Sequence, residues 1–282
     1  SGLYNHSNGM YGHCHGAHHF QCFDRLTSLP ALLNRAGYRT ARIGKLHVAP
    51  DEVFPFDEEI EHWTAANRND VDMAEKCREF IAGDEPFFLY WCSFNPHRSG
   101  DVVADHPLQP NRFGNPEYAY EGDEERRFDE ETLDVPGYLS DTPEVRAELA
   151  QYYQSVARLD RGIGRLMQIL REEGKYDDTL VIYVSDNGSA FPESKTTVYE
   201  AGLRLPCIVK SPLHREAKGT VCDGLVNWAD LAPTILDFAG ADVDPAQFHG
   251  ASFRPILGTA SPSAEEWREQ LYASHTFNQI TN

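Results

Sequence analysis

The stretch 179–188 (TLVIYVSDNG) joins an apolar, β-branched run to two hard oxygen donors, Asp186 and Asn187. The run predicts a strand, and Gly188 permits a sharp turn after it. In open α/β sheets, ligands bind beyond the carboxyl ends of the strands, where such a loop projects. A carboxylate beside a carboxamide suits calcium, or less favourably magnesium. Because Asp-Asn-Gly is also ordinary turn chemistry, the alternative is a turn without a metal.

Four basic side chains lie where the same architecture would place site residues. Lys45 and His47 follow a short apolar strand, and their i, i+2 spacing puts both on one face of an extended segment. His97 lies just beyond a second apolar strand, and Lys195 is close enough along the chain to turn back toward Asp186. Ammonium and imidazole groups can hold an anion or transfer a proton. Taken singly, each is more often an ordinary surface or structural residue.

The amino-terminal segment is rich in imidazoles, at His6, His13, His15, His18 and His19. Imidazole is a ligand for transition metals, but this spacing matches no standard zinc pattern. We therefore expect these side chains to line a polar pocket rather than to form a dedicated metal site. The six cysteines show no C-x-x-C pairing, and burial as small apolar side chains is their expected role.

The composition excludes two classes of function. With 44 acidic against 25 basic residues and a net charge of −19, general nucleic-acid binding is not expected, because affinity for the phosphate backbone needs clustered Lys and Arg. The apolar content of 41% is that of a globular protein, and no segment approaches the roughly 20 apolar residues of a membrane span. An anionic small substrate needs only a local positive pocket and stays open.

Apolar periodicity predicts an α/β fold in which a mostly parallel central sheet is flanked by helices. The expected strands are 40–43, 86–92, 179–184 and 206–210, and the expected helices are 28–34, 70–81, 142–174 and 230–238. In the helix 70–81, Asp70 is the expected amino-terminal cap. A Pro-, Gly- and acid-rich stretch at 93–141 either lines a site or is a solvated excursion.

Five motifs in order resemble the sulfatase family of the alkaline-phosphatase-like superfamily. They are 1–10 (SGLYNHSNGM), 37–47 (GYRTARIGKLH), 185–188 (SDNG), 199–206 (YEAGLRLP) and 249–257 (HGASFRPIL). Further likeness to the heparan N-sulfatase branch lies at 8–12, 18–20, 95–98 and 191–192. The resemblance implies an alkaline-phosphatase-like sandwich. It also implies hydrolysis of sulfate esters or sulfamates on a glycan such as heparan-type N-sulfoglucosamine, in a periplasmic, extracellular or lysosome-like compartment.

The same resemblance implies a role for each candidate residue. The Asp186–Asn187 pair would bind calcium, while Lys45 and Lys195 would hold the sulfuryl oxygens. His47 would help to turn over a sulfated formylglycine intermediate. His97 would contact or protonate the leaving group. In the family, the formylglycine nucleophile is made from the first residue of a C/S-x-P-x-R motif.

No C/S-x-P-x-R motif occurs in the 282 residues, and the usual first pair of metal carboxylates has no candidate before Lys45. We therefore expect an internal piece of a sulfatase, truncated at both ends. Residues 1–258 would be a partial catalytic domain without the nucleophile, expected before Ser1, and 259–282 the start of a carboxyl-terminal region. Alone, this piece should be marginally folded, bind calcium weakly and not hydrolyse sulfate.

Two alternatives stay open at this stage. A phosphatase or phosphodiesterase of the same superfamily would use overlapping metal chemistry, although the Lys45, His47 and Lys195 set argues against it. A non-catalytic relative that binds sulfated glycan would keep the same basic residues. The sequence leaves open the choice between N-sulfate and O-sulfate, the glycan and the oligomeric state.

Overall fold

The computed structural model describes residues 1–15, 18–62, 68–98, 113–116 and 119–273. Within them, a parallel sheet has the strand order β2-β1-β3. These strands are β1 (Arg39–Gly44), β2 (Glu58–Ile60) and β3 (Phe87–Cys92). Ile43 of β1 lies between Ile60 of β2 and Trp91 of β3, so the register aligns apolar residues across the sheet. The sheet therefore confirms the two strands expected at 40–43 and 86–92 and adds β2.

The other two expected strands form a second ladder. β4 (Val181–Val184) and β5 (Cys207–Lys210) pair in an antiparallel arrangement, with Val184 opposite Cys207. The α/β expectation, with a parallel sheet flanked by helices, is confirmed, while the described strands divide into two ladders.

One face of the parallel sheet packs against α3 (Asp70–Glu75), α4 (Arg78–Ala82) and α5 (Pro143–Glu172). Met73, Ile81 and Ile169 from these helices are almost fully buried. Alternate residues of β3, including Leu89 and Trp91, join the same core, as the period of two in a strand requires.

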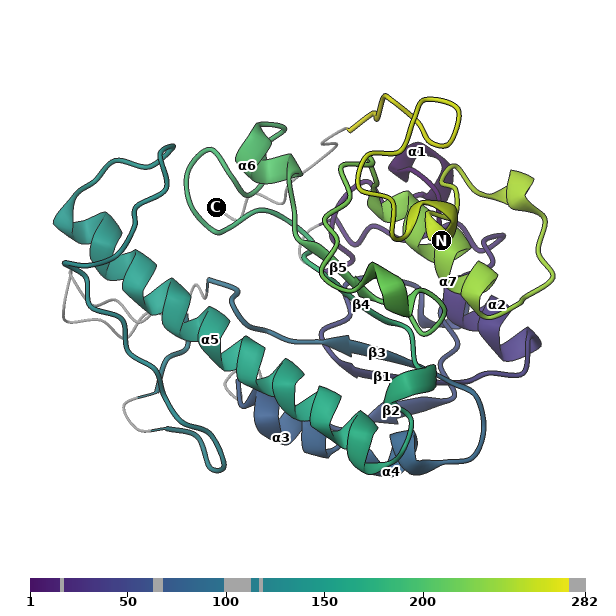
Figure 1. Ribbon diagram of the computed structural model, residues 1–282, viewed down its shortest axis with the longest axis horizontal. Helices are drawn as coiled ribbons and strands as arrows, with labels where there is room; N and C mark the ends of the chain where they lie inside the picture. Colours follow the sequence, from purple (N-terminus) through teal and green to yellow (C-terminus); the bar gives the residue numbers. More distant parts are fainter. Residues whose placement is uncertain (16–17, 63–67, 99–112, 117–118, 274–282) are drawn as a thin grey trace.

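The opposite face packs against α2 (Leu29–Arg35) and α7 (Leu231–Phe238). Leu33 and Leu236 are buried there, and Phe88 of β3 packs against them. Figure 1 shows the two groups of helices on opposite sides of the strands. Alternate side chains of β3 thus pack against different helical layers, so the sheet lies between two layers of helices.

Local capping chemistry accounts for two of the helix starts. Ser28 accepts a hydrogen bond from Ala31 N at α2, and Thr142 accepts one from Val145 N at α5, each beside a proline in the first turn. Both helices were predicted from these residues. The described chain also contains short helices, which are α1 (Asn5–Asn8), α6 (Glu200–Leu203) and the 3₁₀ turns Asp51–Val53, Tyr176–Asp178, Arg215–Ala217, Trp228–Asp230, Pro245–Gln247 and Arg254–Ile256.

The single helix expected at 70–81 is wrong in two respects. Asn69, rather than Asp70, caps it by accepting a hydrogen bond from Asp72 N, and the helix breaks between α3 and α4 at Lys76 and Cys77. The Asp70 carboxylate is unavailable for capping because it accepts hydrogen bonds from two side chains that follow β3.

A third apolar cluster anchors part of the stretch 93–141 on α5. Phe113 is fully buried against Leu149 of α5 and against Phe191. Residues 99–112 and 117–118 of that stretch, and 274–282 of the predicted carboxyl-terminal region, lie outside the described residues.

Among the described helices, none combines the length and apolar character that a bilayer crossing requires.

Candidate active site

Lys45 leaves the sheet at the carboxyl end of β1. Gly44 has a φ of +84°, and a Cβ atom there would lie 2.2 Å from the carbonyl oxygen of Cys92. Only glycine fits both constraints. The Lys45 amide then donates a hydrogen bond to that same carbonyl over 2.8 Å. Since β1 and β3 are parallel, Lys45 emerges beside the segment that leads from β3 to His97.

Asp186 follows β4 and meets Lys45 across the site. Its Oδ2 atom lies 3.6 Å from Lys45 Nζ, with 71% of the Asp186 side chain exposed against 15% of the lysine. The next residue, Asn187, donates from Nδ2 to the carbonyl of Gly188 over 2.9 Å. Two motifs distant in sequence therefore converge, and the acceptor oxygen of the Asn187 amide is not used in this local contact.

The loop that carries Lys195 folds back onto the same turn. The Lys195 amide donates to the carbonyl of Ser189 over 3.0 Å. The buried Ser194 hydroxyl donates to Ala201 O over 2.9 Å. A Cβ atom on Gly188 would lie 2.4 Å from that hydroxyl oxygen, so the close approach requires glycine. The Asp-Asn-Gly turn and the Lys195 loop are thus one packed unit.

Backbone strain flanks Lys195. Glu193 and Thr196 have φ values of +61° and +66°, in the left-handed region that side chains other than glycine rarely adopt. Each such residue costs about 1–3 kcal/mol and persists only where surrounding contacts hold it. The Thr197 hydroxyl donates to Ser194 O over 2.9 Å and supplies part of that restraint.

His97 is held by a buried polar network beneath it. Arg68 Nη1 donates to the carbonyl of His97 over 2.8 Å. Two residues earlier, Asn95 is buried, and its Nδ2 donates to Asp70 Oδ2 over 2.8 Å. The fully buried Arg158 of α5 donates to Asn95 Oδ1 over 3.2 Å. Satisfied buried networks of this kind fix one geometry.

Sequence reasoning missed this network. Burial raises the pKa of Asp70, against hydrogen bonds from Asn95 and Ser93 that lower it. Arg158 also pairs with Glu125 over 3.0 Å. A signal was available in α5, where buried positions 150, 154 and 158 recur every four residues and two of them are polar. Polar residues on a buried stripe indicate such a network.

The charges of the candidate residues influence one another's pKa values, so these residues share one region. Burial, then Lys195 and Lys45, lower the pKa of His97 to about 4, while Asp186 opposes this. Burial and then Lys45 likewise lower the pKa of His47 to about 4. Burial and Lys45 also lower the pKa of Lys195. Both imidazoles are therefore neutral near pH 7, beside two lysines that an anion would stabilise.

The histidines of the amino-terminal segment do not all lie at the candidate site. His13 and His15 lie against His47, with ring centroids 5.9 and 4.5 Å from it. His6 stacks instead on His249 at 5.5 Å. His18 stacks on a neighbouring phenylalanine ring. Only part of the segment therefore borders the candidate site.

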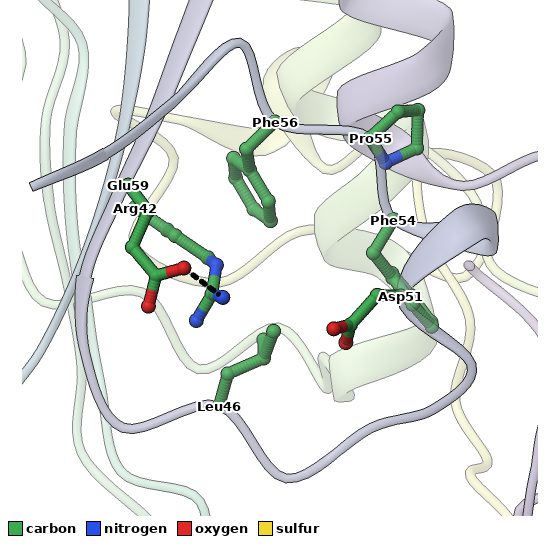
Figure 2. Close-up of a pocket in the computed structure, with 7 residues that line it drawn as sticks. All are labelled: Arg42, Leu46, Asp51, Phe54, Pro55, Phe56 and Glu59. Atoms are coloured by element: carbon green, nitrogen blue, oxygen red, sulfur yellow. Dashed lines mark hydrogen bonds and ion pairs between the residues drawn. The ribbon is translucent and has the colours of Figure 1, made fainter.

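A pocket of about 180 Å³ lies elsewhere (Figure 2). Its lining residues are Arg42, Leu46, Asp51, Phe54, Pro55, Phe56 and Glu59. An ion pair of 2.5 Å joins Arg42 to Glu59 at its wall. Leu46 enters this pocket from between Lys45 and His47, as alternation in an extended segment predicts. The pocket contains none of the candidate residues, so the charged cluster, rather than this cavity, defines the site.

Asp186 and Asn187 fit part of a calcium shell. The carboxylate is largely exposed, and the Lys45 ammonium near it shows that the position favours charge pairing. Calcium takes about six to eight oxygen ligands, so these two side chains would supply a minority of them. The metal role of Asp186 and Asn187, like the catalytic roles of Lys45, His47, His97 and Lys195, stays a prediction.

A sheet between two helical layers, with cationic side chains beyond its strand ends, is the arrangement of the alkaline-phosphatase-like fold. The sulfatase family model matches residues 1–241, and the chain belongs to the sulfatase family. This confirms the resemblance drawn from the five motifs.

Individual relatives and solved structures show which members of the family the chain is similar to. The chain is 40% identical to human N-sulphoglucosamine sulphohydrolase over 293 residues, covering 100% of this chain and 58% of that protein. It therefore spans little more than half the length of this curated relative. A structure in complex with its substrate D-glucosamine-2-N,6-O-disulfate has a TM-score of 0.66 at 22% identity, over 95% of this chain and 70% of that one. The phosphonate monoester hydrolase of Agrobacterium radiobacter also gives 0.66, at 18% identity, over 95% and 67%. These two structures support the fold alone.

Proposed function

We propose that the protein containing this chain hydrolyses a sulfamate or sulfate ester on a glucosamine-type saccharide, with N-sulfoglucosamine as the preferred substrate. The observation that carries this is the convergence of Lys45, His97 and Lys195 beside Asp186, in a chain of the sulfatase family. The 40% identity to human N-sulphoglucosamine sulphohydrolase supports the choice of substrate.

In this proposal, Lys45 and Lys195 bind the sulfuryl oxygens. Both ammonium groups are withdrawn from bulk water, since 15% of the Lys45 side chain is exposed and burial lowers the pKa of Lys195. Charges act more strongly in such a medium of low dielectric. An anion placed between the two lysines relieves their mutual repulsion and raises the pKa of Lys195.

His97 serves the leaving group. Its neutral imidazole, with a pKa of about 4, can donate an N–H hydrogen bond at neutral pH but is a poor proton donor. A bound sulfamate anion would raise that pKa, because it offsets the two lysines that lower it. His97 then gains a proton when substrate is present, and this proton goes to the departing amine or alcohol.

His47 acts in turnover of the sulfated enzyme, as a neutral base beside Lys45. Asp186 and Asn187 would hold calcium, or less favourably magnesium, which supplies positive charge to the sulfuryl oxygens when bound. A formylglycine nucleophile would have to come from outside these 282 residues, because no C/S-x-P-x-R motif lies within them.

The test uses the full-length gene product with three substrates, namely N-sulfoglucosamine, glucosamine 6-sulfate and a phosphonate monoester. Released sulfate is measured by ion chromatography, and the alcohol product of the phosphonate is measured separately. We expect the highest kcat/KM for N-sulfoglucosamine. A preference for the phosphonate would favour the phosphatase-type alternative, and binding of the sulfated sugars without any release would favour a non-catalytic binding protein.

A further inference from the structure

Three imidazoles from two separate segments meet beside the candidate site. The side-chain nitrogens of His13, His15 and His47 lie within 4.8 Å of one another. The ring centroids of His13 and His15 are 5.0 Å apart, and each ring meets His47 at a steep angle.

Backbone contacts hold the two segments together. The Phe20 amide donates to the carbonyl of His13 over 3.1 Å, which closes the histidine loop on itself. The Cys22 amide donates to the carbonyl of Ala49 over 2.6 Å and ties that loop to the segment after His47. These backbone contacts place the two histidine-bearing segments side by side, and side-chain rotation sets the final position of each ring.

We propose that His13, His15 and His47 form a binding site for a divalent transition metal ion of the zinc class, distinct from the Asp186–Asn187 position. Imidazole nitrogen suits zinc and its neighbours, whereas calcium prefers oxygen. Three protein ligands with a fourth position open is a common zinc arrangement. Tetrahedral zinc needs nitrogens about 3.3 Å apart, from bonds of about 2.0–2.1 Å. Small rotations of three side chains close the gap from 4.8 Å.

The local charges both oppose and favour a cation. The Lys45 ammonium influences His47 and would repel a metal ion there. Asp186 Oδ2 lies 3.6 Å from Lys45 Nζ and offsets part of its charge, with 71% of the Asp186 side chain exposed to solvent. The chain as a whole carries a net charge of −19, which attracts cations. Direct coordination by three imidazoles outweighs the remaining repulsion from one partly neutralised lysine.

Occupation of this site would inhibit hydrolysis, a consequence that rests on the proposed function. His47 cannot act as a base while its ring nitrogen is bound to a metal ion, because the lone pair is used in the bond. The site thus makes the enzyme sensitive to free zinc through a residue that the reaction needs.

Binding is tested on the full-length gene product, without any substrate. Zn²⁺ alone is titrated by calorimetry, and Co²⁺ alone is followed by its visible absorption, which is intense for tetrahedral coordination. We expect one ion per chain and at least a tenfold weaker affinity in His13→Gln, His15→Gln and His47→Gln. His18→Gln is the matched control, from the same segment but outside the cluster, and should bind as the wild type does. The proposal is overturned if no stoichiometric binding is seen, or if His18→Gln loses as much affinity as the three cluster variants.

The inhibition arm uses the full-length gene product. We expect Zn²⁺ to reduce sulfate release in the wild type and in His18→Gln but much less in His15→Gln, which keeps His47. Equal inhibition of His15→Gln would overturn the regulatory consequence. A protein that binds zinc at these histidines but releases no sulfate without zinc would contradict the proposed function and leave the metal site standing.

Discussion

At the scale of single residues, positive side chains gather around His97 although the net charge of the whole chain is −19. Lys45 and Lys195 both influence His97, although one follows β1 and the other lies in the loop after β4. Burial of such groups costs free energy, which an incoming anion offsets. The cluster therefore suits the binding of an anion and is not expected to stabilise the fold.

This electrostatic coupling can be measured directly. We predict that Lys195→Met raises the pKa of His97 above about 4, because it removes a positive charge that disfavours the imidazolium. The partial desolvation of His97 remains, so its pKa should stay below that of a fully solvated histidine. NMR titration of the His97 ring proton, in the presence of chelator, provides the value. An unchanged pKa would show that Lys195 lies too far from His97 to share a site.

Part of the site could be predicted because strand ends obey simple rules. Lys45 and Asp186 each follow an apolar run, and residues after such runs gather at one edge of an α/β fold. Their 3.6 Å contact realises that expectation. The approach of His15 to His47 could not be predicted, because it depends on the path of an irregular loop and on the Cys22–Ala49 hydrogen bond.

At the scale of elements, the position of α5 against α3 decides how the polar network is enclosed. A Cβ atom on Gly162 would lie 2.3 Å from Cβ of Asp70, so the two helices approach as closely as glycine allows. Caps and apolar periodicity predicted both ends of α5. The shift of the α3 cap from Asp70 to Asn69 was not predictable locally, because it follows from the use of Asp70 in long-range contacts.

Two glycines of α5 provide a matched test of this packing. We predict that Gly162→Ala destabilises the chain by about 2 kcal/mol, since overpacking typically costs ~1–3 kcal/mol. Gly164→Ala should stabilise it by about 0.5–1 kcal/mol through helix propensity, because a Cβ atom there meets nothing within 4 Å. Urea unfolding gives both values. Changes of the same sign would contradict the close contact between α5 and α3.

At the scale of the whole molecule, partly desolvated neutral histidines link stability to pH. The pKa values of His47 and His97 are about 4 when folded, below the usual 6.5. As pH falls from about 6.5 toward 4, the unfolded chain binds protons that the folded chain resists. These two residues therefore lower the stability of the fold in that window.

A variant isolates this effect from the many carboxylates. We predict that the wild type loses more unfolding free energy than His97→Gln between pH 7 and about 4.5, because glutamine has no proton to gain. Unfolding curves in urea at several pH values supply the comparison. If the two proteins lose stability in parallel, the pKa of His97 is not lowered in the folded chain as described above.

The central claim is that the lysines of this chain bind the sulfuryl group in a sulfatase active site. The most direct test compares sulfate release from N-sulfoglucosamine by the full-length gene product in three forms, the wild type, Lys195→Met and the exposed control Lys218→Met. Loss of one charge-stabilising group should lower kcat/KM by about 100-fold or more in Lys195→Met, with the control unchanged. A Lys195→Met enzyme that works at the wild-type rate would contradict the account.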